Sequence, residues 1–231
     1  MAGMSNPGAP VIGVLNLQGG VAEHLDHLAR IGVAGKPVKE AAEIAGLAGL
    51  IIPGGESTCL TRLMRIFGIA DAVRREFHGG MKIWGTCAGA ILLASAVVGE
   101  EPFLSLIDME IERNSFGSQL DSFAYDASIP RVSREPIPLV FIRAPRITRV
   151  GPGVEILLAM DTFVAAAESD GVLATVFHPE LTGSLAFHRY FAAKCGIASH
   201  GENAGPDTDP SWNMRSWTRL ARIACTESPG P

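Results

Sequence analysis

A cysteine flanked by glycines is the residue of this sequence best placed to do chemistry. Within MKIWGTCAGA, at positions 81–90, an apolar run passes through Gly85, Thr86, Cys87, Ala88 and Gly89 into a run of small residues. This spacing is typical of a nucleophile elbow, a tight strand-to-helix turn that lifts the central side chain above a sheet. N–H groups at the following helix start would stabilise a thiolate and a developing oxyanion. The pattern alone leaves a purely structural turn open.

A thiol nucleophile needs a general base and a group that orients the base. Of the six histidines, His178 is the best candidate, because it ends the apolar run in TVFHPE and falls at the same sheet edge as Cys87. If the chain stays extended through Pro179, the two-residue period of a strand points His178 and Glu180 to one side. The sequence therefore predicts a Cys87, His178, Glu180 triad. The alternative is a strand that ends in a His-Pro turn.

The remaining histidines and cysteines are expected to have no catalytic role. Solvated helix surfaces are favoured for His24, His27 and His188, a loop for His78 and a linker for His200. The inert interpretation, a small hydrophobic side chain, is favoured for Cys59, Cys195 and Cys225. Because no CxxC spacing occurs, the cysteines predict neither a disulfide framework nor a zinc site.

Repeated strand–turn–helix units are expected to position the candidate triad. Apolar runs at 11–17, 47–52 and 81–84 each lead through a glycine-containing turn into a helical pattern, at 21–32, 59–68 and from 88 onward. In the second helix, one face is predicted to hold Leu60, Leu63, Met64 and Phe67. Three such units in succession indicate a parallel sheet covered by helices, with its active site at the carboxyl ends of the strands.

After Gly99 the pattern changes to shorter strands. Met109 and Ile111 alternate with acidic residues, and apolar runs follow at 139–145, 154–160, 162–168 and 171–177. These runs predict added strands and hairpins, with one turn at Asp170 and Gly171. A closing helix is predicted over 184–196.

Composition indicates one large folded domain. The chain has 231 residues, of which 47% are hydrophobic and 19% charged, with a net charge of −5. This balance argues against nucleic acid as a partner, and no apolar stretch reaches the ~20 residues of a membrane span. Scattered cysteines and the lack of a leader pattern favour a cytoplasmic location. We expect a flexible N-terminus over 1–10, one domain over 11–196, and a linker and tail over 197–231.

The tail contains one helical pattern. Trp217, Leu220, Ala221 and Ala224 have the spacing of a short amphipathic helix. Such a helix would be either loosely docked and frayed or a partner-binding element.

Six motifs in order carry a resemblance to a known family. They are LQGGVAEH (17–24), PGGEST (53–58), GTCAG (85–89), ERNSFGSQ (112–119), FIRAP (141–145) and FHPELT (177–182). Over residues 11–196 the chain resembles the class I, or triad, glutamine amidotransferases, and more narrowly the glutaminase subunits of two-protein pyridoxal 5′-phosphate synthases. The resemblance implies an α/β fold, a three-layer sandwich around a central, mostly parallel, flavodoxin-like sheet. It implies neither a cofactor nor a metal.

The same resemblance implies roles for individual residues. Cys87 would attack the side-chain carboxamide of L-glutamine, His178 would move the protons, and Glu180 would orient His178. Backbone N–H groups of Gly55 and Ala88 would form the oxyanion hole. The implied glutamine-binding residues are Gly54, Gly55, Glu56, Ser57, Arg113, Ile142 and Arg143. Among these, Glu56 would accept the α-ammonium group, and the two arginines would pair with the α-carboxylate.

The resemblance also implies a protein partner. Ammonia would pass to a synthase subunit, a (β/α)₈ barrel that makes pyridoxal 5′-phosphate, the active form of vitamin B6. Gln18 would lie at that interface and help to set the oxyanion hole on docking. Two residues depart from the family pattern: Asn16 replaces a small residue, and Ser118 replaces a basic one that many relatives carry near the interface.

Two other functions stay open at this stage. One is a cysteine hydrolase or stress protein built on a similar elbow sheet, which would turn over no glutamine. The other is a non-catalytic subunit that only regulates the synthase and would form the complex without needing Cys87.

Overall fold

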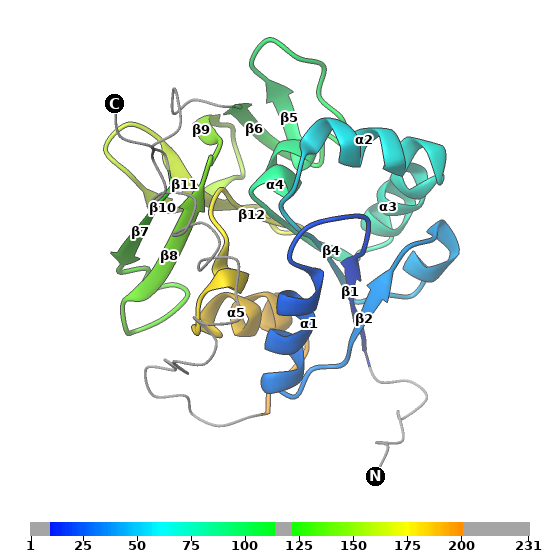
Figure 1. Ribbon diagram of the computed structural model, residues 1–231, viewed down its shortest axis with the longest axis horizontal. Helices are drawn as coiled ribbons and strands as arrows, with labels where there is room; N and C mark the ends of the chain where they lie inside the picture. The colour runs from blue at the N-terminus through cyan, green and yellow to red at the C-terminus, as the bar shows by residue number, and fades with distance from the viewer. Residues whose placement is uncertain (1–9, 114–121, 201–231) are drawn as a thin grey trace, which may run out of the picture.

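A computed structural model describes residues 10–113 and 122–200 of the chain (Figure 1). In order, its elements are β1 (Ile12–Leu15), α1 (Val21–Arg30), β2 (Gly35–Val38), η1 (Ala41–Ile44), β3 (Gly49–Ile52), α2 (Ser57–Ile66), α3 (Ile69–His78), β4 (Lys82–Thr86), α4 (Ala88–Leu93), β5 (Ala94–Val97), β6 (Ile107–Glu112), β7 (Ser122–Ala127), β8 (Ile137–Ile142), β9 (Arg146–Val150), β10 (Glu155–Ala159), β11 (Val164–Glu168), β12 (Val172–Thr175), η2 (Pro179–Leu181) and α5 (Ala186–Lys194).

One large sheet organises these elements. Its strand order is β2-β1-β3-β4-β12-β11-β9-β6-β5, and β10 pairs with β11. The first five strands of this order run parallel to one another. The parallel half contains the three strand–turn–helix units predicted from the sequence, so the carboxyl ends of β1, β3, β4 and β12 meet at one edge.

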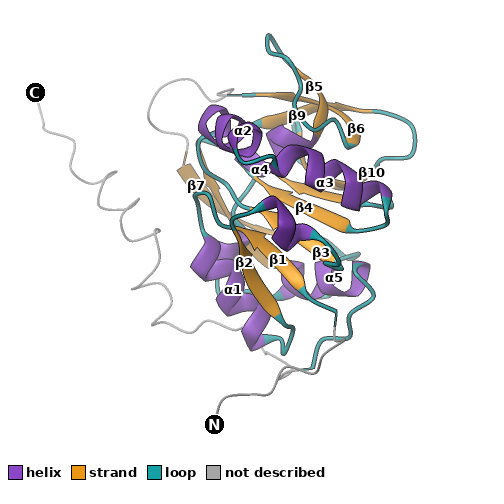
Figure 2. Ribbon diagram, turned by 90° about the vertical axis from the view of Figure 1, so that its right-hand side faces the viewer, coloured by secondary structure: helices purple, strands orange, loops and turns teal. Residues whose placement is uncertain are grey.

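Helices cover both faces of the parallel half. In Figure 2, α1 and α5 lie on one side of β1, β3 and β4, and α2 and α3 lie on the other. Contacts between α1 and α5, and between α2 and both α3 and α4, agree with this division. The predicted three-layer α/β architecture is therefore confirmed.

The burial of each strand explains whether it could be predicted from the sequence. Every residue of β1, β3 and β12 is buried, which is why these strands read as continuous apolar runs. In β6, buried and more exposed residues alternate, as predicted. β2 was not predicted from the sequence, because its four residues include Pro37. Because β2 is an edge strand, a residue without an N–H donor is tolerated there.

The chain after Gly99 forms the predicted strands and hairpins. β11 and β12 are antiparallel, and the turn between them contains Asp170 and Gly171. β7 and β8 pair with each other in a separate antiparallel hairpin (Figure 1). The His178 N–H donates to the Val140 carbonyl of β8 at 2.8 Å. This bond fastens the hairpin to the segment that carries two of the predicted triad residues.

Three local predictions were wrong. Phe67 lies just beyond the end of α2 and is 52% exposed, so it does not share the buried face of Leu60 and Met64. His78 ends α3 and is not part of a loop. The small-residue helix that follows Cys87 stops at Leu93, because the next residues enter the sheet as β5.

Several predictions fall outside the described residues. They concern the N-terminal segment, Ser118, Cys225 and the amphipathic pattern of the tail. Within the described ranges, no helix combines the length and apolar character needed to cross a membrane.

Candidate active site

The elbow around Cys87 has the geometry that the glycine spacing predicted. Cys87 lies between β4 and α4 with φ 49° and ψ −107°, a positive φ that is uncommon for a residue with a side chain. A Cβ on Gly85 would lie 2.5 Å from the Gly89 carbonyl carbon, and one on Gly89 would lie 2.0 Å from the Ile52 oxygen. Both positions therefore require glycine, and the elbow holds the thiol at the carboxyl edge of the sheet.

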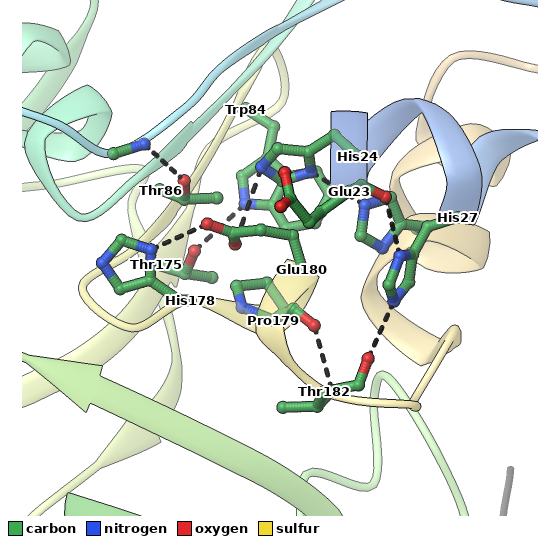
Figure 3. A network of polar contacts seen from close by, with 12 residues as sticks. Glu23, His24, His27, Trp84, Thr86, Thr175, His178, Pro179, Glu180 and Thr182 are labelled. Carbon is green, nitrogen blue, oxygen red and sulfur yellow. Dashed lines mark hydrogen bonds and ion pairs between the residues drawn. The ribbon is translucent and has the colours of Figure 1, made fainter. Parts of the chain in front are cut away.

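His178 lies between the thiol and a buried carboxylate. Its Nδ1 is 2.7 Å from Glu180 Oε1 (Figure 3), and both its ring and the Cys87 side chain lie against Gly54. The expectation of an extended chain through Pro179 was wrong, because residues 179–181 form the 3-10 turn η2. Proline suits the first position of such a turn, since its φ is already fixed near the helical value. The turn still brings Glu180 back to the ring of His178.

The charges of this pair stabilise each other. Burial disfavours a charged His178, but the Glu180 carboxylate and the Cys87 side chain outweigh it and raise the pKa of His178 well above its ordinary value. Burial likewise opposes the Glu180 charge, but His178 and His24 outweigh it and lower the pKa of Glu180. An imidazolium next to a carboxylate is therefore favoured at neutral pH.

Three of the histidines expected on solvated surfaces are instead buried. The side chains of His24, His27 and His188 are fully excluded from solvent. The spacing in α1 explains the error: His24 is three residues after Val21 and four before Leu28, so it falls within the apolar stripe of the helix. In α5, His188 lies on the face that buries Phe191 and Ala192.

A cavity of about 480 Å³ opens beside this triad. Its lining includes every site residue implied by the resemblance, namely Gln18, Gly54, Gly55, Glu56, Ser57, Cys87, Ala88, Arg113, Ile142, Arg143, His178 and Glu180. Five further lining residues had no predicted role, namely Gly19, Gly20, Ile91, Pro145 and Leu181. Segments far apart in the chain thus converge on one site.

The turn at Gly54 and Gly55 packs tightly against the triad. The Gly54 N–H donates to the Thr86 hydroxyl at 3.0 Å, and a Cβ on Gly54 would lie 2.4 Å from His178 Cε1. Gly55 has φ +155°, and a Cβ there would lie 2.5 Å from Gln18 Oε1. The same Gln18 oxygen accepts the Glu56 N–H at 2.5 Å. Gln18 therefore packs on the turn that would supply one oxyanion-hole donor.

The charged residues that line the cavity are partly engaged in ion pairs and hydrogen bonds. The Glu56 carboxylate accepts the N–H groups of Thr58 and Cys59, at 3.0 and 2.6 Å, and so caps α2. These bonds, with Thr58 foremost, lower the pKa of Glu56 despite some opposing desolvation. Arg113 pairs with Glu100, where the shorter contact is 2.6 Å, and with Glu56 at 3.4 Å.

Arg143 differs from Arg113. It has φ +43° and an exposed side chain. No ion pair joins it to another residue in the described ranges, so it is the guanidinium more readily available to an anionic ligand.

Some residues around the site were not singled out from the sequence. Thr86 and Gly19 lie inside the motifs GTCAG and LQGGVAEH. Their positions next to Cys87 and Gln18 in the sequence could therefore have indicated that they lie near the site. His24 was also signalled, by its place in the apolar stripe of α1. Leu181 was signalled by its place next to Glu180 in FHPELT. Ile91 carried no local signal, because its approach to the cavity depends on tertiary packing.

Two other expectations about single residues can be compared with the structure. Cys59 is exposed and Cys195 is partly buried, so the buried interpretation was wrong for Cys59. Burial raises the pKa of Cys195 to about 12, which keeps that thiol protonated. Asn16 donates its backbone N–H to the Val38 carbonyl, a contact open to any residue but proline, so the structure does not explain its departure from the family pattern.

Over the described ranges, no group of three or more His, Cys, Asp or Glu side chains is arranged to hold a metal ion.

Comparison with solved structures defines the class of protein. One chain, described as "Crystal structure of glutamine amidotransferase", superimposes with a TM-score of 0.76 at 42% identity and covers 80% of this chain and 99% of its own. A second, described as "Structure of PurLQS from Thermotoga maritima", has a TM-score of 0.57 at 14% identity and supports the fold alone. The architecture is that of a glutamine amidotransferase.

Sequence comparison narrows the class to a family. A model of the SNO glutamine amidotransferase family matches residues 14–196, and this chain belongs to that family. It is 60% identical over 210 residues to "Pyridoxal 5′-phosphate synthase subunit PdxT" of Syntrophus aciditrophicus (strain SB), covering 91% of this chain and 94% of that protein. A protein with the same description from Ruminiclostridium cellulolyticum is 48% identical, covering 78% of this chain and 97% of its own.

The first of these relatives also bears on the tail. An alignment of 210 residues cannot fit within residues 1–196, so it includes part of the chain after Gly196. The resemblance noted from the sequence ends at Gly196, whereas the alignment with this relative extends beyond it.

Proposed function

We propose that this chain is the glutaminase subunit of a pyridoxal 5′-phosphate synthase. It hydrolyses L-glutamine to glutamate and ammonia and delivers the ammonia to a synthase subunit. The observation that carries the proposal is the Cys87 elbow facing the His178–Glu180 pair at one cavity, in a chain of the SNO glutamine amidotransferase family. Residues 11–196 form the amidotransferase domain, and the chain works in the cytoplasm.

The reaction is an acyl transfer through Cys87. The thiolate attacks the side-chain carbonyl carbon of glutamine, and the N–H groups of Gly55 and Ala88 stabilise the oxyanion. His178 gives a proton to the departing ammonia and leaves a glutamyl thioester on Cys87. Water, deprotonated by His178, then attacks the thioester and releases glutamate. Glu180 holds the ring of His178 in the orientation that both steps need.

The substrate's charged groups are held at the cavity mouth. Arg143 takes the α-carboxylate, and its open guanidinium supports this role. Glu56 takes the α-ammonium group through an oxygen shared with the α2 cap. Arg113 reaches the carboxylate when its contact with Glu100 rearranges. Gly54, Ser57 and Ile142 complete the wall around the glutamine side chain.

The partner is a synthase subunit of (β/α)₈ barrel fold. The descriptions of the relatives support a synthase complex, since each is called a subunit. Gln18 supports a link between docking and catalysis, because it lies at the cavity rim and contacts the turn of Gly55 and Glu56. Docking there would fix the Gly55 N–H toward the oxyanion.

Glutamate and ammonia release from L-glutamine tests the proposal. The purified chain is assayed alone and with a cognate synthase subunit, beside Cys87→Ala. We expect turnover that appears or rises with the partner and is lost in Cys87→Ala. Cys59→Ala is the matched control, because Cys59 is an exposed cysteine outside the cavity lining, and it should retain full activity.

The alternatives predict different results. A regulatory subunit would bind the synthase without turnover and without any effect of Cys87→Ala. A cysteine hydrolase or stress protein would leave glutamine intact while Cys87 reacts with other acyl compounds. Either result would overturn the proposal.

A further inference from the structure

A buried polar chain continues behind the triad. Glu180 Oε1 faces His178, and Glu180 Oε2 lies 3.6 Å from His24 Nε2. The other ring nitrogen of His24, Nδ1, is 2.8 Å from His188 Nε2. All three side chains beyond His178 are at most 1% exposed. Figure 3 shows His24 reaching from α1 toward Glu180.

The contacts determine which nitrogens carry protons. If His24 were protonated on Nδ1, its bare Nε2 lone pair would face the Glu180 carboxylate, and the two would repel each other. Protonation on Nε2 removes this repulsion and leaves Nδ1 to accept the N–H of His188 Nε2. His188 Nδ1 is then a bare acceptor, which agrees with its lack of a hydrogen-bond partner. In this arrangement the His188 N–H points to His24, and the His24 N–H points to Glu180.

We propose that His24 is a positioning residue of the triad, whose Nε2–H faces Glu180 Oε2 and keeps Oε1 turned toward His178. This inference rests on the triad assignment proposed above. At 3.6 Å the contact is longer than a hydrogen bond, so it acts as a charge–dipole interaction in the free subunit. Catalytic hydrogen bonds are often long before substrate binds and shorten afterwards. His188 acts one step further away, by fixing the tautomer of His24.

Burial supports a neutral His24. Desolvation lowers the pKa of His24 to about 4, the Glu180 charge opposes this, and His27 and His178 add to it. Desolvation also lowers the pKa of His188 well below its ordinary value. Both rings are neutral at pH 7, so the contact to Glu180 is made by an N–H group and not by an imidazolium. The titratable groups that interact with the Glu180 charge are His178, His24 and His27.

Aromatic packing holds the two rings in place. Trp84 meets His24 edge-on at a centroid distance of 5.5 Å and meets His188 edge-on at 4.9 Å. The Trp84 N–H itself donates to Thr175 at 3.1 Å. The orientation of His24 is therefore set by the core, as positioning a second residue requires.

The tautomer of His24 can be measured without any variant. In the ¹⁵N-histidine-labelled chain, two-bond ¹H–¹⁵N correlations distinguish Nε2–H from Nδ1–H rings. We expect a neutral Nε2–H ring for His24, with no titration between pH 5 and 8. An Nδ1–H tautomer, or a His24 that is charged at pH 7, would overturn the inference.

Two matched substitutions test the catalytic consequence. His24→Gln keeps an N–H group near the position of Nε2, whereas His24→Leu does not, and both remove the acceptor at Nδ1. In the complex with the synthase subunit, we expect His24→Leu to lower kcat roughly 10-fold with little change in KM, and His24→Gln to recover most of that loss. If kcat falls equally in both variants, His24 only fills the core and the inference is wrong.

The pH dependence of Cys87 alkylation distinguishes a positioning role of His24 from a role in core packing. Loss of the His24 N–H donor raises the pKa of Glu180. The rate of Cys87 alkylation by iodoacetamide, measured against pH, should therefore begin to fall at a higher pH in His24→Leu than in the wild type. In His24→Gln the acid side of this profile should not move. An acid side that is unchanged in both variants would contradict the inference. Failure of the triad assignment gives a different result, namely glutamine turnover that survives Cys87→Ala.

Discussion

Single residues decide whether this site can exist. The backbone at Cys87 has a positive φ, and the turn at Gly54 approaches the His178 ring so closely that no side chain fits between them. Glycines at 85 and 89 were interpretable from the sequence, because a nucleophile elbow needs them wherever it occurs. The need for glycine at 54 follows only from the distance to His178, which no local pattern contains.

Gly54→Ala should block catalysis while leaving the fold in place. The new Cβ would lie 2.4 Å from His178 Cε1 and 3.2 Å from Cys87 Cβ, so the imidazole must move away from the thiol. We expect a loss of kcat of roughly 100-fold or more, since misplaced catalytic groups cost about that much. Steady-state glutaminase assays of the complex, beside circular dichroism of the subunit, measure both effects.

Gly79→Ala is the control for that substitution. A Cβ on Gly79 would lie 3.2 Å from the backbone oxygen of Glu76, and Gly79 lies outside the cavity lining. Full activity of Gly54→Ala, with Gly79→Ala also active, would show that the His178 ring does not need its present position.

At the scale of elements, the sequence predicted more of the sheet than of its connections. β1, β3, β4 and β12 could be found because strands buried on both faces are mostly apolar. The 3-10 turn η2 could not, because a His-Pro-Glu segment is equally compatible with an extended strand. The bond from His178 to β8 joins residues far apart in the chain and leaves no local signal.

Gly89→Ala tests the packing of α4 on β3. Helix propensity alone predicts stabilisation of up to about 1 kcal/mol, because alanine is favoured over glycine within a helix. The structure predicts the opposite sign, since the Cβ would lie 2.0 Å from the backbone oxygen of Ile52. We expect the free energy of unfolding in urea to fall by about 1–3 kcal/mol. An increase would contradict the close approach of these two elements.

At the scale of the whole molecule, the buried histidines link stability to pH. From the sequence, His24, His27 and His188 were expected on solvated helix surfaces. Their burial depends on α1 and α5 packing together on one face of the sheet (Figure 2). A single amphipathic helix does not show which neighbour covers it.

Acid should destabilise this protein below about pH 6.5. Burial lowers the pKa values of His24, His27 and His188, so below pH 6.5 the unfolded chain binds protons that the folded chain does not. For His24 this window extends down to about pH 4. The stability contributed by these three histidines is therefore complete above pH 6.5 and falls as the pH falls. His24 alone contributes a loss of about 2 kcal/mol at pH 5. His178 has a raised pKa, and its contribution is instead lost at higher pH.

Urea unfolding at pH 7 and pH 5 measures this dependence. His188→Gln removes one titrating group and should reduce the difference between the two free energies. A wild-type free energy that is unchanged between these pH values would contradict the burial of neutral histidines.

The central claim is that Cys87 carries the glutamyl group during turnover. The most direct test is to quench the complex in acid during hydrolysis of L-glutamine and map the adduct by peptide mass spectrometry. We expect a glutamyl thioester on the peptide that contains Cys87, with the exposed Cys59 unmodified. Glutamine hydrolysis without an adduct on Cys87, or with the adduct on another cysteine, would contradict the account.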